Sequence, residues 1–226
     1  MTPYTILLIT RCSRIEFLKN IWSTIKAQAA KLENGNKFVW FIAFDTNRLS
    51  LAKIDRKFIE YLMYKQDIIK VHYMYSSSDN ERYGSNIANA VLNHDVIIKR
   101  NDITHAYLLD DDNDLYPTFY SICNELPDDK LQFFSQVRLD KGPNTRQVID
   151  ITNELRADNA VQWVDSAQII FPFQKLMECG GFADGYCIDG LTVKKMLEAG
   201  VEYKTTNIIS AYYNYYTELL PFGITE

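Results

Sequence analysis

The sequence predicts an α/β fold in one domain, with a mostly parallel central sheet flanked by helices. Three observations support this prediction: short β-branched apolar runs alternate with segments of helical periodicity, each run ends in polar residues, and no repeat, low-complexity tract or linker interrupts the 226 residues. Strands separated by helices form parallel sheets with right-handed crossovers, so their polar ends meet at one edge. Ligands bind at that edge of open sheets.

The first predicted strand and helix follow each other directly. Tyr4 to Thr10 is a β-branched run that suits a strand buried on both faces, and it ends in the polar stretch Arg11-Cys12-Ser13-Arg14. Ser13 and Glu16 have the spacing of a capping box, and apolar residues then repeat at helical spacing as far as Ala29. We therefore expect a strand, a tight loop and an amphipathic helix.

Three more strands and a helix are predicted in the first half of the chain. The apolar runs again end in polar residues, and the last of them runs straight into Asp110. The predicted strands are Phe38 to Phe44, Ile68 to Tyr75 and Ala106 to Leu109, and the predicted helix is Gly84 to Leu92.

Beyond Pro117 the pattern loosens. Leu131 to Leu139 looks extended, and Ala167 to Phe171 looks like a further strand. Pro172 is suited to the first position of a helix, and Asp189 to Ala199 fits another helix that Gly200 ends.

Composition excludes several classes of protein. The net charge is −5 and the basic residues are scattered, so no surface for nucleic acid is indicated. The four cysteines show no CxxC spacing and the three histidines no ligand spacing, which argues against a zinc site and a disulfide framework. No apolar run approaches the roughly 18 residues that a membrane span needs. We therefore expect a cytoplasmic protein with no membrane span.

An acidic cluster follows the fourth predicted strand and is the most informative stretch of the sequence. Asp110, Asp111, Asp112 and Asp114 are crowded together, which is costly unless a cation neutralises them. Carboxylate oxygens suit Mg²⁺ or Mn²⁺, and on an extended backbone Asp110 and Asp112 point to the same side. The cluster therefore predicts a metal site, with a solvated acidic turn as the alternative.

Two other acidic motifs do not fit this cluster. An EF-hand loop that begins at Asp110 needs glycine at its sixth position and glutamate at its twelfth, where this chain has Leu115 and Ser121. An aspartyl-phosphate nucleophile normally lies after the first strand and is followed by threonine or valine, whereas Asp112 is followed by Asn113.

The order of these motifs resembles that of GT-A glycosyltransferases, which have a Rossmann-like fold, and is most similar to the inverting family-two type. The resemblance spans most of the chain. It implies one domain over residues 1–226, with a nucleotide-binding half at 1–117 and an acceptor-binding half at 118–226. It rests on Ile9 to Arg14, Asp45, Arg82 to Ala90, the DxD motif of Asp110 and Asp112 with Pro117 five residues on, and Cys179 to Gly185 followed by Ile188-Asp189.

The resemblance also implies which residues hold the nucleotide-sugar donor. Asp110 approaches the ribose and the metal, and Asp112 ligates the Mn²⁺ or Mg²⁺ ion that bridges the two phosphates. Where the family has alanine-arginine-asparagine, this chain has Ile87-Ala88-Asn89, with no basic residue. The other candidate nucleotide contacts are Thr10, Arg11, Asp45, Gly84, Asn86 and Asp111.

Asp189 is in register with the catalytic aspartate of the family, counted back from Gly200, so the resemblance implies that it is the general base. A helix cap is the alternative role for Asp189, and Asp184 is the second candidate for the base.

Several residues are candidates for the sugar and the acceptor. Asp165 and Gln168 are expected to hydrogen-bond sugar hydroxyls, and Trp163 to stack on a sugar face, although a structural role fits them equally well. The tyrosines from Tyr212 to Tyr216 indicate core packing or a homo-oligomer contact, with a cover over an acceptor site as the alternative.

The activity that the resemblance implies is transfer of a sugar, from a UDP-sugar by expectation, to a hydroxyl of a carbohydrate or glycoconjugate acceptor in polysaccharide biosynthesis. The anomeric centre is expected to be inverted. A retaining GT-A transferase, a sugar-nucleotidyltransferase and a nucleotide- or glycan-binding module without catalysis remain alternatives.

Overall fold

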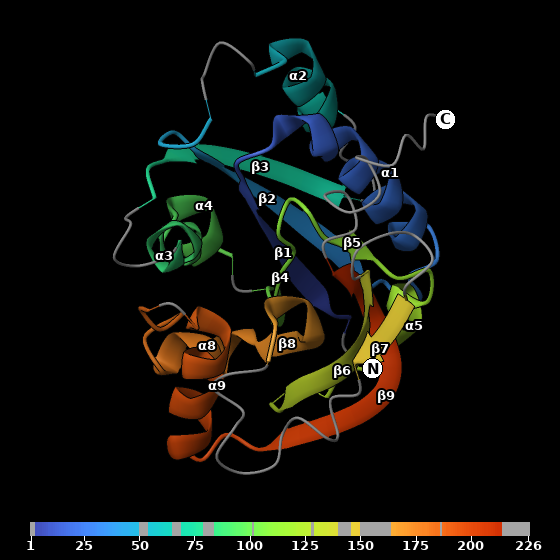
Figure 1. Cartoon of the computed structure of the whole chain (residues 1–226), viewed down its shortest axis with the longest axis vertical. Helices are drawn as coiled ribbons and strands as arrows, with labels where there is room; N and C mark the ends of the chain where they lie inside the picture. The colour runs from blue at the N-terminus through green and yellow to red at the C-terminus, as the bar shows by residue number, and fades with distance from the viewer. Residues whose placement is uncertain are drawn as a thin grey trace.

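A nine-stranded sheet organises the described part of the chain, as the computed structural model in Figure 1 shows. The described residues are 3–49, 54–64, 69–78, 84–100, 102–127, 129–139, 146–149, 164–185 and 187–213. The candidate stacking residue Trp163, the tyrosines beyond Tyr213, and Arg82 and Tyr83 of the glycine-containing segment lie outside these residues.

The first four strands of the sheet are parallel, in the order β3-β2-β1-β4. Leu7 of β1 lies opposite both Val39 of β2 and Ala106 of β4, so the carboxyl ends of these strands meet at one edge. The predicted α/β class and this parallel arrangement are therefore confirmed. The strands are β1 (Thr5–Cys12), β2 (Lys37–Asp45), β3 (Ile69–Ser76) and β4 (His105–Leu108).

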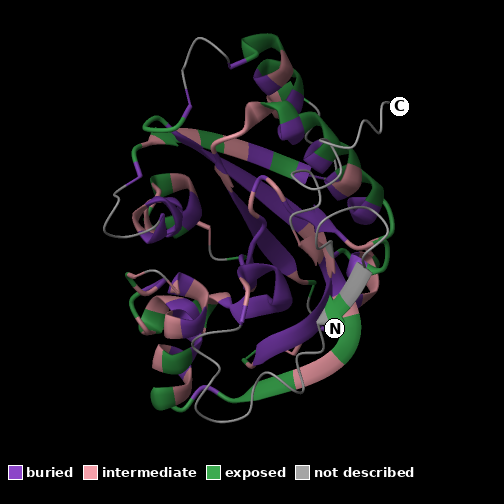
Figure 2. Cartoon of the chain, in the orientation of Figure 1, coloured by how far each residue is buried: buried purple, intermediate pink, exposed green. Residues whose placement is uncertain are grey.

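Helices cover both faces of the parallel strands, because alternate residues of β1 belong to two different cores. Ile6 and Leu8 face the core with α1, α2 and α5, whereas Leu7 and Ile9 face the core with α3, α4, α8 and α9. Figure 2 shows β1 and β2 buried between the helical layers, whereas β3 at the edge of the sheet is partly exposed. The helices are α1 (Leu18–Ala29), α2 (Arg56–Tyr64), α3 (Ser85–Leu92), α4 (Asp95–Ile98), α5 (Phe119–Cys123), α8 (Phe173–Glu178) and α9 (Ile188–Glu198).

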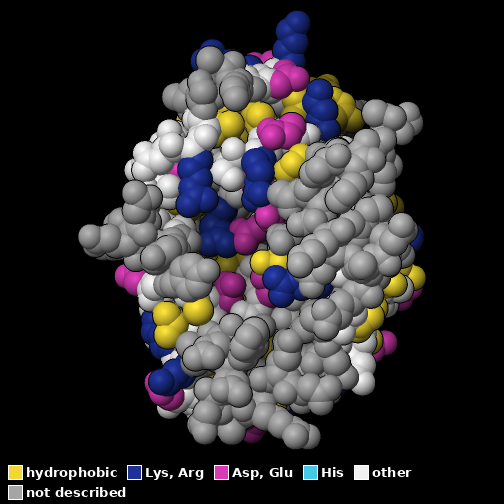
Figure 3. All heavy atoms as spheres, in the orientation of Figure 1, with side chains coloured by type: hydrophobic (Ala, Val, Ile, Leu, Met, Phe, Trp, Pro, Cys, Tyr) yellow, Lys and Arg dark blue, Asp and Glu magenta, His cyan; other side chains and the backbone are white. Residues whose placement is uncertain are grey.

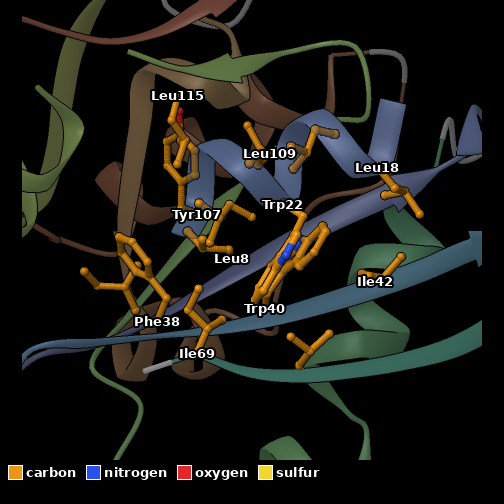
Figure 4. Close-up of a cluster of buried hydrophobic side chains, with 14 of the residues drawn as sticks. Leu8, Leu18, Trp22, Phe38, Trp40, Ile42, Ile69, Tyr107, Leu109 and Leu115 are labelled. Carbon is orange, nitrogen blue, oxygen red and sulfur yellow. The ribbon is translucent and has the colours of Figure 1, made fainter. Parts of the chain in front are cut away.

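The core on the α1 side is rich in large aromatic rings. The indoles of Trp22 in α1 and Trp40 in β2 stack with their centroids 6.1 Å apart and their planes 8° apart (Figure 4). The indole N–H of Trp40 donates to the hydroxyl of Thr10 over 2.9 Å. This bond satisfies a polar group that would be costly to bury alone, and it fixes the end of β1 from which the site loop departs.

The second half of the sheet is mixed. β8 (Ile169–Pro172) pairs antiparallel with β4 and with β6 (Leu131–Leu139), and β6 pairs with the long, curved strand β9 (Tyr203–Tyr213) in parallel. The short β5 (Asp114–Leu115) pairs with the end of β9, so that Asp114 lies opposite Tyr212, and β7 (Arg146–Ile149) lies beside β6. The carboxyl end of β9 therefore returns to the acidic cluster.

Some local expectations were wrong. Ser13 and Glu16 form no capping box: the 3-10 helix η1 (Ile15–Phe17) precedes α1, its N-cap residue is Arg14, and no side chain caps it. The hydroxyl of Ser13 instead donates to Asp111, which lies far along the chain. A long-range carboxylate thus competes successfully with the local cap.

The boundaries in the second half also differ from the predicted ones. Residues 166–168 form the 3-10 helix η3 (Ser166–Gln168), so β8 begins only at Ile169. Pro172 ends β8 and is the N-cap residue of α8 rather than its first helical residue. No helix in the described part of the chain has both the length and the apolar character needed to cross a membrane.

Candidate active site

A cavity of about 210 Å³ opens at the carboxyl edge of the parallel strands. Its walls come from the loop after β1, the ends of β2 and β3, the start of α3, the acidic cluster, Asp165 and the end of β9. In Figure 3, basic and acidic side chains lie next to each other in a hollow on this face. The structure therefore brings the predicted strand-end residues to one place, as parallel strands require.

Asp111 is the most deeply buried residue of the acidic cluster, with 1% of its surface exposed. One carboxylate oxygen accepts from the backbone N–H of Ser13 (2.5 Å), the Ser13 hydroxyl (3.0 Å) and the backbone N–H of Arg14 (2.7 Å). The other oxygen accepts from Nε and Nη2 of Arg14, over 2.9 and 2.5 Å. Asp111 was expected to contact the nucleotide, but both of its oxygens already hold the loop after β1.

The two flanking aspartates are each paired with an arginine: Asp110 with Arg11 at the end of β1, and Asp112 with Arg14 in the loop after it. Arg11 donates Nε to Oδ1 of Asp110 over 2.7 Å and Nη2 to Oδ2 over 2.5 Å, in a bidentate ion pair. Nη2 of Arg14 lies 3.0 Å from Oδ2 of Asp112. Two guanidinium groups therefore face three carboxylates, and one negative charge is left over.

The carboxylate of Asp112 is disfavoured in its ionised form by its surroundings. Burial raises the pKa of Asp112, the charges of Asp110 and Asp111 raise it further, and Arg14 acts in the opposite direction. The described residues hold no cluster of three or more His, Cys, Asp or Glu side chains with metal-binding geometry. Mg²⁺ is typically bound by one or two carboxylates together with substrate phosphates and water, so Asp110 and Asp112 fit an ion that a diphosphate completes.

Asp189 lies in the first turn of α9 without capping it. The N-cap residue of α9 is Cys187, and no side chain makes the cap bond, so the cap alternative for Asp189 was wrong. The backbone N–H of Ser166 lies close enough to the Asp189 carboxylate to lower its pKa. The Oδ1 atom of Asp189 is buried and has no hydrogen-bond partner among the described residues.

Asp189 is not among the residues that line the cavity, but its pKa depends on residues that are. Burial raises the pKa of Asp189 to about 7, against the opposing charge of Arg11 and with a further rise caused by Asp110. Burial also raises the pKa of Asp165 well above its usual range, and the charge of Asp189 adds to that rise. Perturbed carboxylates of this kind are typical of functional sites.

Asp165 and Gln168 form the capping box of η3. Asp165 accepts from the backbone N–H of Ala167 over 2.8 Å, and the Gln168 side chain accepts from the backbone N–H of Asp165 over 3.1 Å. Asp165 also lines the cavity, whereas Gln168 is fully buried and donates to the Phe134 carbonyl over 3.4 Å. The expected sugar contact therefore stays a prediction for Asp165, while Gln168 supports η3 from the core.

The other predicted nucleotide contacts divide into two groups. Asp45 and Gly84 line the cavity; Asp45 accepts from the backbone N–H of Ser78 over 3.0 Å, and Gly84 has a φ of 87°, which glycine tolerates best. Thr10 and Asn86 are not among the residues that line it. Thr10 is buried against Trp40, and the Asn86 amide donates to the Ser77 carbonyl over 2.7 Å.

Asp184 connects two walls of the site without lining the cavity. Its Oδ1 atom accepts from the Ser85 hydroxyl over 2.6 Å, which joins the glycine-rich segment before α9 to the start of α3. This contact gives Asp184 a structural role, and its role as a second candidate base stays a prediction.

Sequence reasoning missed Arg14 and Arg48 as site residues, and both line the cavity together with Tyr213, one of the tyrosines for which a cover over an acceptor site was the alternative role. Tyr213 arrives through the pairing of β5 with β9, and the Arg138 guanidinium lies 4.8 Å from the centroid of its ring. Arg14 could have been predicted as a site residue, because it lies in the loop that directly follows the first strand, close to Arg11 in the sequence.

No protein-family model and no curated protein matches the sequence. Solved structures do match. TarS from S. aureus in complex with UDP-GlcNAc superposes with a TM-score of 0.62 at 10% identity, covering 93% of this chain and 58% of that chain. The mannosyltransferase PcManGT from Pyrobaculum calidifontis, in complex with GDP-Man and Mn²⁺, gives 0.63 at 13% identity, covering 95% and 57%.

This chain has a GT-A fold. The same fold is also similar to the inositol-1-phosphate CTP transferase from T. maritima, with a TM-score of 0.51 at 10% identity over 93% of this chain and 88% of that chain. A GT-A fold therefore accommodates more than one kind of transfer from a nucleotide, and the reaction has to be argued from the site. This chain spans less than two-thirds of the two glycosyltransferase chains.

We predict that Asp111→Ala destabilises the protein by about 3–5 kcal/mol, because it leaves the arginine and backbone donors of the β1 loop without their buried partner. The free energy of unfolding in urea measures this loss. Asp102→Ala is the matched control: Asp102 pairs with Lys37 and Arg100 but is 45% exposed, so its loss should cost less than about 1 kcal/mol. Equal losses in the two variants would contradict the anchoring role.

Proposed function

We propose that this protein is a metal-dependent glycosyltransferase that moves a sugar from a nucleoside-diphosphate donor, a UDP-sugar in the first instance, to a hydroxyl of a glycan or glycoconjugate. The observation that carries the proposal is the cavity at the strand edge, where Asp110 and Asp112 stand beside Asp45 and Gly84. The fold supports it, since TarS was crystallised with UDP-GlcNAc and PcManGT was solved with GDP-Man and Mn²⁺.

The two halves of the domain divide the substrates in this proposal. Residues 1–117 hold the nucleotide: Asp45 takes the base, Gly84 allows close approach of the backbone, and Asp110 approaches the ribose. Residues 118–226 hold the acceptor, with Asp165 and Tyr213 on the wall of the cavity that this half contributes. Tyrosine suits this wall because its ring packs on a sugar face while its hydroxyl bonds to sugar oxygens.

Asp112 would hold the metal, and Asp110 lines the same cavity. A metal bound there would stabilise, as a Lewis acid, the charge that develops on the departing diphosphate. Arg11 keeps Asp110 oriented through its two hydrogen bonds. Asp111 holds the whole segment against the loop after β1, so the ligands are in position before the donor arrives.

Asp189 is the proposed general base. As the acceptor oxygen attacks the anomeric carbon and the bond to the diphosphate breaks, the hydroxyl proton passes to the Asp189 carboxylate. Oδ1 lacks a donor among the described residues, and the acceptor hydroxyl would supply one. The raised pKa, about 7, suits proton transfer at neutral pH. Attack from the side opposite the leaving group inverts the anomeric centre.

A sugar-nucleotidyltransferase is the second candidate, favoured by the similarity to the T. maritima CTP transferase. The two reactions leave different products. A glycosyltransferase releases a nucleoside diphosphate from a nucleotide sugar, whereas a nucleotidyltransferase releases pyrophosphate from a nucleoside triphosphate and a sugar phosphate. A protein that binds nucleotides and releases neither product would be a binding module.

We predict that nucleotide sugars with Mn²⁺ yield free nucleoside diphosphate, and that EDTA or Asp112→Ala lowers the rate about 100-fold or more, because the charge on the leaving group is no longer neutralised. A coupled nucleoside-diphosphate assay over a panel of donors measures this release. Asp95→Ala, which removes an exposed carboxylate of α4, is the control and should behave like the natural chain. Unchanged turnover in Asp112→Ala would refute the metal site.

We predict that kcat/KM rises with pH through about 7, because only the deprotonated form of Asp189 accepts a proton and its pKa is raised to about 7. Asp189→Asn should lower kcat by about 10²–10⁴-fold and flatten this limb of the profile, with donor affinity retained. Initial rates between pH 5.5 and 8.5 test this. Near-full turnover by Asp189→Asn would remove the base and, with it, the argument for inversion.

A further inference from the structure

Arg14 has a hydrogen-bond donor that no described residue uses. Its Nε and Nη2 atoms are taken by Asp111, and Nη2 is also the atom that lies near Asp112. Nη1 has no hydrogen-bond partner among the described residues. The Arg14 side chain is 35% exposed and lines the cavity, so a ligand in the cavity can reach it.

The other described cations of the cavity are committed elsewhere or far more exposed. Arg11 is 16% exposed and spends two donors on Asp110. The Arg48 side chain is 65% exposed and stands 3.7 Å from Asp45 through Nε. Arg14 is therefore the guanidinium that combines a fixed position, access to the cavity and an uncommitted nitrogen.

The wall of the cavity formed by Gly84 and Ile87, at the start of α3, carries no cation of its own among the described residues, and the side chain of Arg11 lies against Gly84. Asn89, one turn further on, uses its amide on the backbone of Phe182, donating to the carbonyl and accepting from the N–H, both over 2.8 Å. Among the described residues, the guanidinium groups available to a diphosphate in this cavity are therefore those of Arg11, Arg14 and Arg48.

Charge balance favours an anion at this position once a metal is present. The three carboxylates exceed the charge of Arg11 and Arg14 by one unit, so a divalent ion changes the sign of the cluster to positive. An ion at Asp112 also competes with Arg14 for the same carboxylate, because Nη2 of Arg14 lies 3.0 Å from Oδ2. Metal binding would thus loosen one contact of Arg14 and leave those with Asp111.

We propose that Arg14 is a second phosphate-binding cation: Nη1 donates to an oxygen of the donor diphosphate while Asp111 holds Nε and Nη2, and the metal replaces Arg14 at Asp112. This inference rests on the proposed function, since it needs a nucleotide diphosphate in the cavity. It makes Asp111 a positioning residue that aims Arg14 rather than a nucleotide ligand. The binding of the metal and the binding of the diphosphate are then coupled, because each ligand lowers the free-energy cost of binding the other.

Titration calorimetry with UDP, GDP, uridine and guanosine in the presence of Mn²⁺ tests the proposal without any turnover. Arg14→Gln should weaken the binding of the preferred diphosphate about 10- to 100-fold, the range for loss of a charged hydrogen bond, and leave the matching nucleoside unchanged. Mn²⁺ alone should bind Arg14→Gln at least as tightly as the natural chain, because its competitor for Asp112 is gone. Lys19→Gln removes an ammonium that is 67% exposed and is the control.

Arg14→Lys is a second variant that separates loss of the phosphate contact from a folding defect, and thermal unfolding is measured for each variant. Lysine keeps the charge but lacks the planar fork, so it should recover part of the diphosphate affinity that Arg14→Gln loses. Diphosphate affinity unchanged in both variants, or diphosphate and nucleoside weakened equally, would overturn the role of Arg14. A natural chain that binds neither diphosphate with Mn²⁺ would overturn this role and the proposed function together.

Discussion

The site depends on the partial neutralisation of three adjacent carboxylates by two arginines that are distant in sequence, Arg11 at the end of β1 and Arg14 in the loop after it. The parallel pairing of β1 with β4 makes this possible, because it sets the loop after Cys12 beside the segment after Leu108. An unpaired charge in such an enclosed position would lower the stability of the folded protein, so removing either the arginine or the carboxylate of a pair should be destabilising. The folded protein therefore holds an incompletely neutralised acidic cluster at the edge where parallel sheets bind ligands.

The proposed chemistry follows from the different roles of the aspartates in this cluster. Asp110, Asp111 and Asp112 all line the cavity, but both oxygens of Asp111 are used to fix the loop after β1. Arg11 influences Asp110 through hydrogen bonds and Asp189 through its charge, so donor side and acceptor side share one cation. The described residues that would hold the metal, the diphosphate and the acceptor proton are thus electrostatically connected.

The sequence predicted the parallel strands and half of the described residues that line the cavity, because apolar runs that end in polar residues report strand ends directly. It could not tell which way Thr10 faces: both faces of β1 are buried, so its residues show no alternation, and Thr10 turns inward to Trp40. Ser13 was misread since its partner Asp111 is remote in sequence. No turn signal in the sequence indicates that β9 returns to the cavity. The position of Tyr213 in the cavity therefore follows only from the pairing of β9 with β5.

The central claim is that Asp112 and a nucleotide diphosphate share one divalent ion at the end of β4. Anomalous diffraction from crystals soaked with Mn²⁺ and UDP tests it most directly. The account predicts a manganese peak within coordinating distance of an Asp112 oxygen and of a UDP phosphate oxygen, with Arg11 still paired to Asp110. A diphosphate bound to the arginines with no manganese peak, or a peak away from Asp112, would contradict it.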